Sequence, residues 1–188
     1  MLLLVPAALL LSSALTIDTA ISDEPGQNPL GPAQSGMVQC YDPDTASHTC
    51  RSIAAYRRGR DGVWTNIATI MPDPGQPLTV EVESPVEVRD GAVCGTLRRD
   101  QVLGAKLRFF DRLVPADHAL PVLVGIADAM AGVIDREVCT RYVPAAGGLV
   151  ARARITGISA AFPDQRVIWV RTDAGFRVQP KGAGRTAG

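Results

Sequence analysis

The sequence predicts an α+β domain, in which one amphipathic helix packs on a mainly antiparallel sheet that is built from hairpins. Three observations lead to this class. Apolar and polar residues alternate through much of the first half and again after residue 137, as in half-buried strands. Between these stretches, residues 119–135 repeat apolar side chains every three or four positions, which predicts a helix. The order strands, helix, strands is typical of α+β domains.

The clearest strand covers residues 78–88, where Leu78, Val80 and Val82 share one face. Pro85 falls on the opposite face and has no N–H to donate, so this strand is expected at a sheet edge or with a bulge. Asp90 and Gly91 then predict a hairpin turn into a return strand over 92–98. A two-residue loop places Cys94 on the polar face, and a longer turn does not; both arrangements remain open.

A second hairpin is expected between residues 50–58 and 63–71, and a further strand at 105–110 precedes the helix. The apolar stripe of the helix includes Leu120, Leu123 and Ile126, whereas Gly125 weakens it intrinsically. Its stability must therefore come from contact with the sheet. Later strands are expected at 137–143, 149–158, 166–171 and 175–178.

The N-terminal segment predicts export. Residues 1–17 carry no charge and include an apolar run of signal-peptide length, with cleavage expected within 14–20. Because no Lys or Arg precedes this run, an uncleaved inner-membrane anchor is the alternative. We expect a Pro- and Gly-rich linker over 18–36, a single domain over 37–180 and a disordered tail over 181–188. The mature protein would have no membrane span and would be periplasmic or secreted.

Four cysteines in an exported chain predict two disulfides. Of the three pairings, the nearest-neighbour one is favoured, Cys40 with Cys50 and Cys94 with Cys139, since residues 41–49 read as a hairpin loop. The longer loop should make the second bridge the more stabilising. The spacing excludes zinc, because no CxxC pair occurs.

Motifs for catalysis and cofactors are missing from the sequence. No phosphate-binding loop or dinucleotide fingerprint occurs, so no cofactor is expected. Ser159 lacks the second glycine of a nucleophile turn, and the segment from Asp42 to Ser47 lacks the glycine and closing Glu of a calcium loop. His48 and His118 have no evident catalytic partner. An enzyme is therefore not the favoured interpretation.

The basic C-terminal third carries the candidate binding site. Residues 138–188 contain 8 basic and 2 acidic residues. Arginine beside an aromatic ring can bind anions through paired hydrogen bonds and stacking. The candidate surface comprises Arg152, Arg154, Arg166, Trp169 and Arg171. The alternative is that these arginines only keep solvated strands soluble and that Trp169 belongs to the core.

Three cysteine-containing strings carry a resemblance. They are QCYDPDTASHTCRSIAAYRR, DGAVCGTLR and EVCTRYVP, and they resemble small exported bacterial proteins with four cysteines. This resemblance implies no activity, cofactor or catalytic residue. The functional hypothesis is a non-enzymatic binding or interaction module of the cell envelope, with an anionic envelope component or another protein as partner and no nucleic acid. The alternative is a hydrolase whose catalytic residues are scattered on loops.

Overall fold

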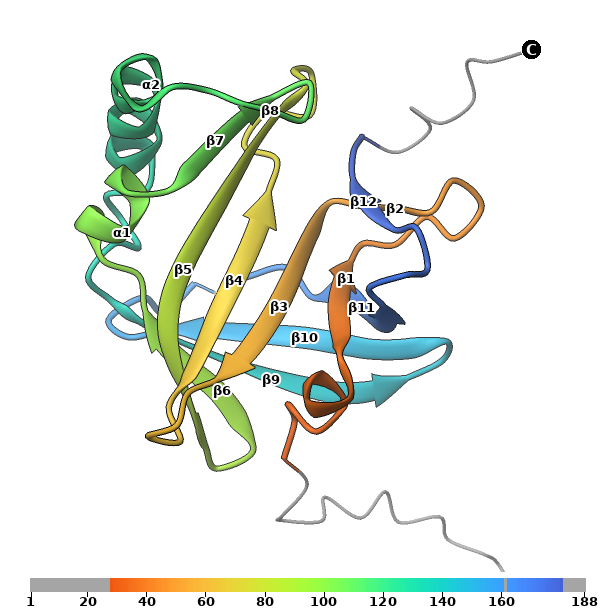
Figure 1. Ribbon diagram of the computed structural model, residues 1–188. Coiled ribbons are helices and arrows are strands. Elements are labelled where there is room, and N and C mark those ends of the chain that lie inside the picture. Colours follow the sequence, from red (N-terminus) through yellow and green to blue (C-terminus); the bar gives the residue numbers. More distant parts are fainter. Residues whose placement is uncertain (1–27, 161, 181–188) are drawn as a thin grey trace, which may run out of the picture.

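The computed structural model describes residues 28–160 and 162–180 and corrects the predicted fold class. The protein is an eight-stranded antiparallel β-barrel with a minor helical part (Figure 1). The expected α+β arrangement, a helix on a sheet layer, is wrong because the sheet closes on itself. The elements are η1 Pro32–Ser35, β1 Met37–Tyr41, β2 Thr49–Cys50, β3 Ser52–Arg58, β4 Trp64–Ile70, β5 Leu78–Arg89, β6 Ala92–Thr96, α1 Arg99–Leu103, β7 Lys106–Phe109, β8 Arg112–Leu113, α2 Ala116–Ala129, β9 Glu137–Ala145, β10 Gly148–Ile155, β11 Gln165–Arg171 and β12 Arg177–Val178.

The strand order of the barrel is β4-β3-β1-β11-β10-β9-β6-β5, and a β4–β5 pairing closes the ring. Neighbouring strands are antiparallel throughout the ring. β7 and β8 extend the sheet from β5, and β2 pairs with β12 outside the barrel. Ring closure gives each of the eight strands a neighbour on both sides for at least part of its length, which limits the usual route to edge-to-edge aggregation.

β5 is the longest strand and joins the barrel to its extension. On one side its residues 80–86 pair with β4, while on the other side 78–81 pair with β7 and 86–89 pair with β6. Residues 82–85 therefore have no strand partner on that second side, and Pro85, which lacks an N–H, lies in this gap. The turn into β6 has two residues, with φ of 51° at Asp90 and 71° at Gly91. This register puts Cys94 opposite Glu87, on the polar face.

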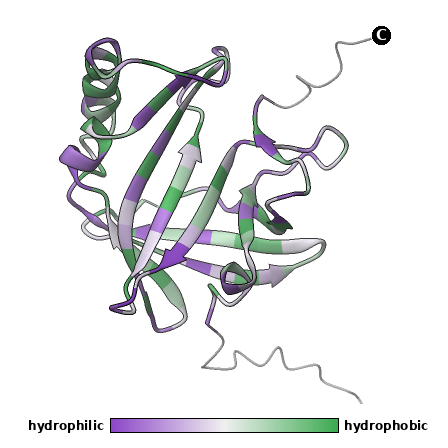
Figure 2. Ribbon diagram, in the orientation of Figure 1, coloured by the Kyte–Doolittle hydropathy of each residue, from purple (hydrophilic) through white to green (hydrophobic). Residues whose placement is uncertain are grey.

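Alternate residues of each barrel strand point inward. At one end of the interior, Leu30, Trp64 and Val93 form a buried cluster. Farther along, Ala54, Val82, Ala151 and Val167 are also buried. The opposite phase faces outward and is polar over much of the barrel, as the hydrophilic bands along several strands in Figure 2 illustrate. This two-residue alternation is why the individual strands could be read from the sequence.

The predicted helix exists but is displaced and shorter. α2 covers Ala116–Ala129 instead of 119–135, and residues 130–135 form turns. Leu123 is 2% exposed and packs on Val80 and Leu107, with Ile126 at the edge of the same cluster. Leu120, expected in the buried stripe, is 48% exposed. The helix thus covers a local patch on β5 and β7 and does not form a layer of its own (Figure 1).

Replacing Gly125 with alanine should raise the free energy of unfolding by about 1 kcal/mol, since alanine is the better residue inside a helix. Gly125 lies in the middle of α2, is exposed, and has no atom within 4 Å of an added Cβ. Thermal denaturation of the two proteins checks this, with a higher melting temperature expected for the variant. An unchanged or lower melting temperature would mean that α2 does not unfold together with the barrel.

The folded domain begins before the predicted boundary at Met37. Leu30 is fully buried, and η1, which follows it, packs against β1 and β3. Residues 28–36 therefore belong to the barrel and not to the linker. The predicted leader, the remainder of the linker at 18–27 and the tail at 181–188 lie outside the described residues. Within residues 28–160 and 162–180, no helix reaches the length and apolarity that crossing a membrane requires.

Both disulfides are present, pairing Cys40 with Cys50 and Cys94 with Cys139. The first is 0–1% exposed and lies in an apolar cluster with Val170 on the outer side of β1, β3 and β11. The segment around β12 covers this cluster, with Phe176 packed against it. The bridge therefore fastens β2 to β1 on the barrel wall, and the pairing of β12 with β2 holds the C-terminal segment there.

Candidate anion-binding face

Four arginines lie on the outer side of three neighbouring strands. We call this set the arginine face: Arg141 on β9, Arg152 and Arg154 on β10, and Arg166 on β11. All four are exposed. They share the outward phase because their neighbours Tyr142, Ala151 and Val167 point into the barrel. Figure 2 shows hydrophilic bands on β9 and β10 in this part of the wall.

The ladder register brings like charges together. Arg141 and Arg152 are directly opposed across β9 and β10. Arg154 is opposite Cys139 on the same pair of strands, and Arg166 is opposite Val150 on β11 and β10. Side chains that face each other across antiparallel strands have Cβ atoms about 5 Å apart, where like charges repel. The face therefore carries an electrostatic cost that a bound anion would relieve.

Few acidic groups neutralise this face. The Nε of Arg152 donates a hydrogen bond to Asp164 Oδ2 at 3.1 Å. No carboxylate of the described residues lies within 4.0 Å of the guanidinium groups of Arg141, Arg154 or Arg166. Elsewhere in the molecule, Arg57, Arg89, Arg98, Arg99 and Arg171 are each paired with a carboxylate. Other described arginines, such as Arg60, Arg112 and Arg177, also have no carboxylate within 4.0 Å, so what distinguishes the face is the grouping of its arginines on neighbouring strands. Three unpaired guanidinium groups on neighbouring strands are thus available to an external anion.

The structure brings together three of the five candidate residues, Arg152, Arg154 and Arg166. Trp169 points inward and packs against the cluster of Leu30 and Trp64, so its indole belongs to the core. Arg171 follows the inward phase to the end of β11 and binds Asp173 through two hydrogen bonds of 2.9 and 2.8 Å. Neither side chain is part of the arginine face.

Arg141 is the member of the face that sequence reasoning missed. The signal was present in the hairpin of β9 and β10, whose loop is Ala146–Gly147. Counting back from this loop places Arg141 opposite Arg152. The charge of Arg141 was visible in the sequence, but its position beside Arg152 depends on the register of the hairpin.

Neither histidine lines the open groove beside the β5–β6 hairpin. His48 Nδ1 is 2.9 Å from the carbonyl oxygen of Ala174, and its ring stacks on Phe176 with the centroids 4.9 Å apart. His118 is exposed at the start of α2, 3.7 Å from Asp117. The larger pocket, an open groove of about 710 Å³ between the β3–β4 loop and the β5–β6 hairpin, includes neither residue in its lining. Over residues 28–160 and 162–180, no group of three His, Cys, Asp or Glu side chains could hold a metal ion.

All three tyrosines of the chain meet inside the barrel. The hydroxyls of Tyr41 and Tyr142 lie 2.6 Å apart, and those of Tyr56 and Tyr142 lie 3.3 Å apart. Tyr41 and Tyr56 also donate hydrogen bonds to Gln39 Oε1, at 3.1 and 2.9 Å. Gln39 is fully buried, and its Nε2 has no hydrogen-bond partner among the described residues. Burial, together with the neighbouring tyrosines, raises the pKa of Tyr41 and Tyr56, and burial raises that of Tyr142.

These raised pKa values predict how stability depends on alkaline pH. The unfolded tyrosines ionise near pH 10, about the usual pKa, whereas the folded protein keeps their protons. The unfolded state therefore loses protons first, so the contribution of these tyrosines to stability is constant below about pH 9 and falls above about pH 10. Tyrosinate absorbance should stay low until the barrel unfolds and then rise in one cooperative step, together with loss of the circular dichroism of the strands. A gradual rise centred near pH 10 with unchanged circular dichroism would contradict the buried cluster.

Comparisons with known proteins add no family to this description. No protein-family model, no curated protein and no solved structure matches the chain. The arginine face is therefore interpreted from its own geometry and charge.

Proposed function

We propose that this protein is an exported, non-enzymatic binding module that attaches to an anionic polymer of the cell envelope through the arginine face. The observation that carries the proposal is the outward clustering of Arg141, Arg152, Arg154 and Arg166, for which Asp164 is the single carboxylate partner in the part of the chain that the structure describes. Such a concentration of one charge attracts ligands of the opposite charge.

The chemistry of the ligand follows from the guanidinium group. Its planar fork of N–H donors fits phosphate, sulfate or carboxylate oxygens in pairs. Along β10, Arg152 and Arg154 are two residues apart, about 6.5 Å, and Arg141 lies about 5 Å from Arg152 across the ladder. A polymer with an oxyanion on each repeating unit can contact several of these groups at once. A single small anion can contact only one or two.

Two further features support export. Two disulfides suit an oxidising compartment such as the periplasm or the outside of the cell. The apolar N-terminal run has the length of a signal peptide. The hydrolase alternative gains no comparable support, since His48 and His118 lie outside the groove that would have to hold a substrate.

Affinity for a defined polyanion tests the proposal. Dextran sulfate and long-chain polyphosphate serve as probes, and the dissociation constant is measured against salt concentration. Replacing the four arginines of the face with glutamine should weaken binding at low salt at least tenfold and flatten the salt dependence, because fewer counterions are released.

The matched control makes the same charge change away from the face. It replaces four exposed arginines outside β9, β10 and β11 with glutamine, namely Arg57 on β3, Arg60 in the β3–β4 loop, Arg112 on β8 and Arg177 on β12. Retained affinity in this control, with loss in the face variant, is the expected pair of results. An equal loss of affinity in both variants would mean that binding depends only on net charge and would contradict the proposed site. An unchanged affinity in the face variant would also reject it.

A further inference from the structure

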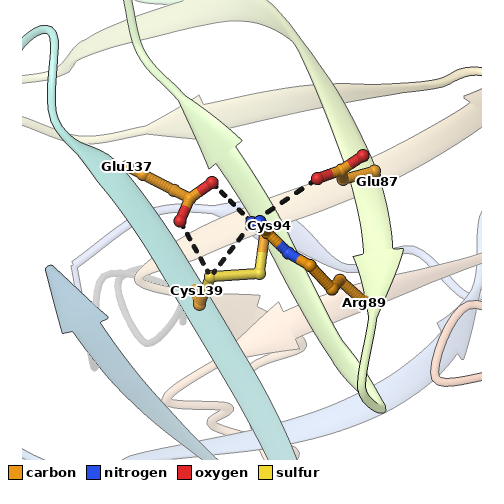
Figure 3. Close-up of polar contacts among 5 residues, drawn as sticks. All are labelled: Glu87, Arg89, Cys94, Glu137 and Cys139. Carbon is orange, nitrogen blue, oxygen red and sulfur yellow. Dashed lines mark hydrogen bonds and ion pairs between the residues drawn. A yellow bond between two sulfur atoms is a disulfide. The ribbon is translucent and has the colours of Figure 1, made fainter. Parts of the chain in front are cut away.

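The disulfide of Cys94 and Cys139 crosses directly between two barrel strands. The residues are opposed on β6 and β9, both in the outward phase (Figure 3). Cys94 is 3% exposed, whereas Cys139 is half-buried. We therefore expect a reagent that arrives from solvent on this outer side to meet Cys139, the more exposed of the two residues, first.

Charged groups surround the sulfur of Cys139. The guanidinium of Arg89, on β5, lies 3.9 Å from it, and a carboxylate oxygen of Glu137 lies 3.8 Å from it (Figure 3). Arg89 also pairs with Glu137 and with Glu87. On the other side of β9, Arg154 is opposite Cys139 in the ladder and has no carboxylate partner among the described residues. Arg89 neutralises part of the negative charge of Glu87 and Glu137 beside the sulfur, and the unpaired Arg154 adds a positive charge on the other side, so an anionic thiolate can approach Cys139.

The second disulfide is a natural internal control. Cys40 and Cys50 are 0–1% exposed and are packed among Val38, Ile53, Ile168, Val170 and Phe176. A thiolate would have to lose its hydration and displace apolar side chains to reach this bridge, which is costly. The two bridges of one chain should therefore differ strongly in their reactivity.

We infer that Cys94–Cys139 is an exchangeable disulfide whose reaction partner is an external dithiol. One thiolate of the dithiol attacks the sulfur of Cys139, a new S–S bond forms to Cys139, and the bond to Cys94 breaks. Cys94 leaves as a thiolate and takes a proton from water. The second sulfur of the dithiol, as a thiolate, then attacks the dithiol sulfur that is bonded to Cys139 and closes the S–S bond of the oxidised dithiol. Cys139 leaves as a thiolate and takes a proton from water. The protein disulfide gains two electrons and the dithiol is oxidised to its disulfide.

The barrel can survive this exchange. β6 and β9 remain joined by five opposed residue pairs, from Ala92 with Arg141 to Thr96 with Glu137. β6 is also held by β5, and β9 by β10. The reaction therefore opens one crosslink beside the arginine face and leaves the strand order intact.

Graded reduction of the folded protein tests the inference. Dithiothreitol is added at increasing concentration, free thiols are trapped with iodoacetamide, and the labelled peptides are identified by mass spectrometry while circular dichroism follows folding. Cys94 and Cys139 should become labelled at a dithiothreitol concentration at least tenfold lower than Cys40 and Cys50, with the circular dichroism unchanged. Simultaneous labelling of all four, earlier labelling of Cys40 and Cys50, or labelling only after unfolding would overturn the inference.

The arginine contribution is tested by rate. Arg89→Gln should slow the reaction of the Cys94–Cys139 bridge with glutathione several-fold, whereas Arg112→Gln, a change on β8, should not. Glutathione should be found attached to Cys139 and not to Cys94. An unchanged rate in Arg89→Gln, or attachment to Cys94, would contradict the proposed approach of the thiolate.

Discussion

Replacing Gly148 with valine should destabilise the barrel by about 3 kcal/mol or more, through two effects at one position. Gly148 has a φ of +149°, which side chains rarely adopt. A Cβ at this position would lie 2.5 Å from the carbonyl oxygen of Val167 and 2.9 Å from Cγ2 of Ile168. Because Val167 belongs to the barrel wall, its backbone cannot move without disturbing the pairing of β10 and β11. Chemical denaturation should show a clear loss of stability or no folded protein.

Gly36→Ala separates the two effects. Gly36 has a φ of +73°, but an added Cβ meets no atom within 4 Å. The Gly36→Ala variant should lose about 1 kcal/mol of unfolding free energy, which is the cost of the left-handed backbone conformation alone. Similar losses in the two variants would mean that the collision with β11 contributes nothing and that the close approach of β10 and β11 is misplaced.

Removing the Cys94–Cys139 bridge by paired alanine substitutions should cost about 4 kcal/mol from chain entropy, and removing Cys40–Cys50 about 3 kcal/mol. The sequence separations are 45 and 10, and the longer loop restricts the unfolded chain more. The difference expected is about 1.3 kcal/mol. Urea denaturation of both double variants under oxidising conditions measures it.

The deeper burial of Cys40 and Cys50 works in the opposite direction, because alanine there also removes apolar contacts. A loss from the Cys40 and Cys50 pair that equals or exceeds the loss from the other pair would show that these contacts outweigh loop length. Comparison with a Val170→Ala variant, which removes contacts from the same cluster and leaves the bridge, separates the two contributions.

Local features of the fold could be predicted from the sequence. Strong alternation along residues 78–88 and the turn at Asp90 and Gly91 are consequences of local physics, so the β5–β6 hairpin is found where it was expected. The nearest-neighbour disulfides are likewise present. The strands of the β5–β6 hairpin are adjacent in the sequence, and Cys40 and Cys50 are only 10 residues apart. Cys94 and Cys139 are 45 residues apart and lie on the paired strands β6 and β9.

Barrel closure could not be predicted in the same way. It depends on pairings such as β1 with β11, which join residues 37–41 to residues 167–171. Inward positions on β1 and β3 include Gln39, Tyr41 and Tyr56, which look like solvent-facing residues in a single sequence. The tyrosine hydroxyls and the Oε1 of Gln39 bind one another inside the barrel, so the hydrophobic pattern does not reveal this face. The prediction of an α+β class therefore relied too heavily on the one helix, whereas the closed sheet defines the fold.

The candidate site shows the same limit. Arg152 and Arg154 are two residues apart, so their shared face followed from strand alternation alone. The sequence left open whether Trp169 lies in the core or on the binding surface, because both faces of β11 are apolar near this residue. In the structure, Trp169 packs inside the barrel, and Ile168 and Val170 are covered on the outer side. The position of Arg141 beside Arg152 could be found only from the register of the β9–β10 hairpin. Residues of one strand could thus be grouped from the sequence, whereas grouping across strands required the structure.

The binding role of the arginine face is tested most directly by mapping where an anion binds. In a nuclear magnetic resonance titration of the labelled protein with short-chain polyphosphate, the side-chain signals of Arg141, Arg152, Arg154 and Arg166 and the backbone signals around them should shift together. Signals from the groove between the β3–β4 loop and the β5–β6 hairpin, and from α2, should stay in place. Shifts centred on the groove would contradict a binding site on β9, β10 and β11. Shifts of similar size at all exposed arginines of the protein would contradict it as well.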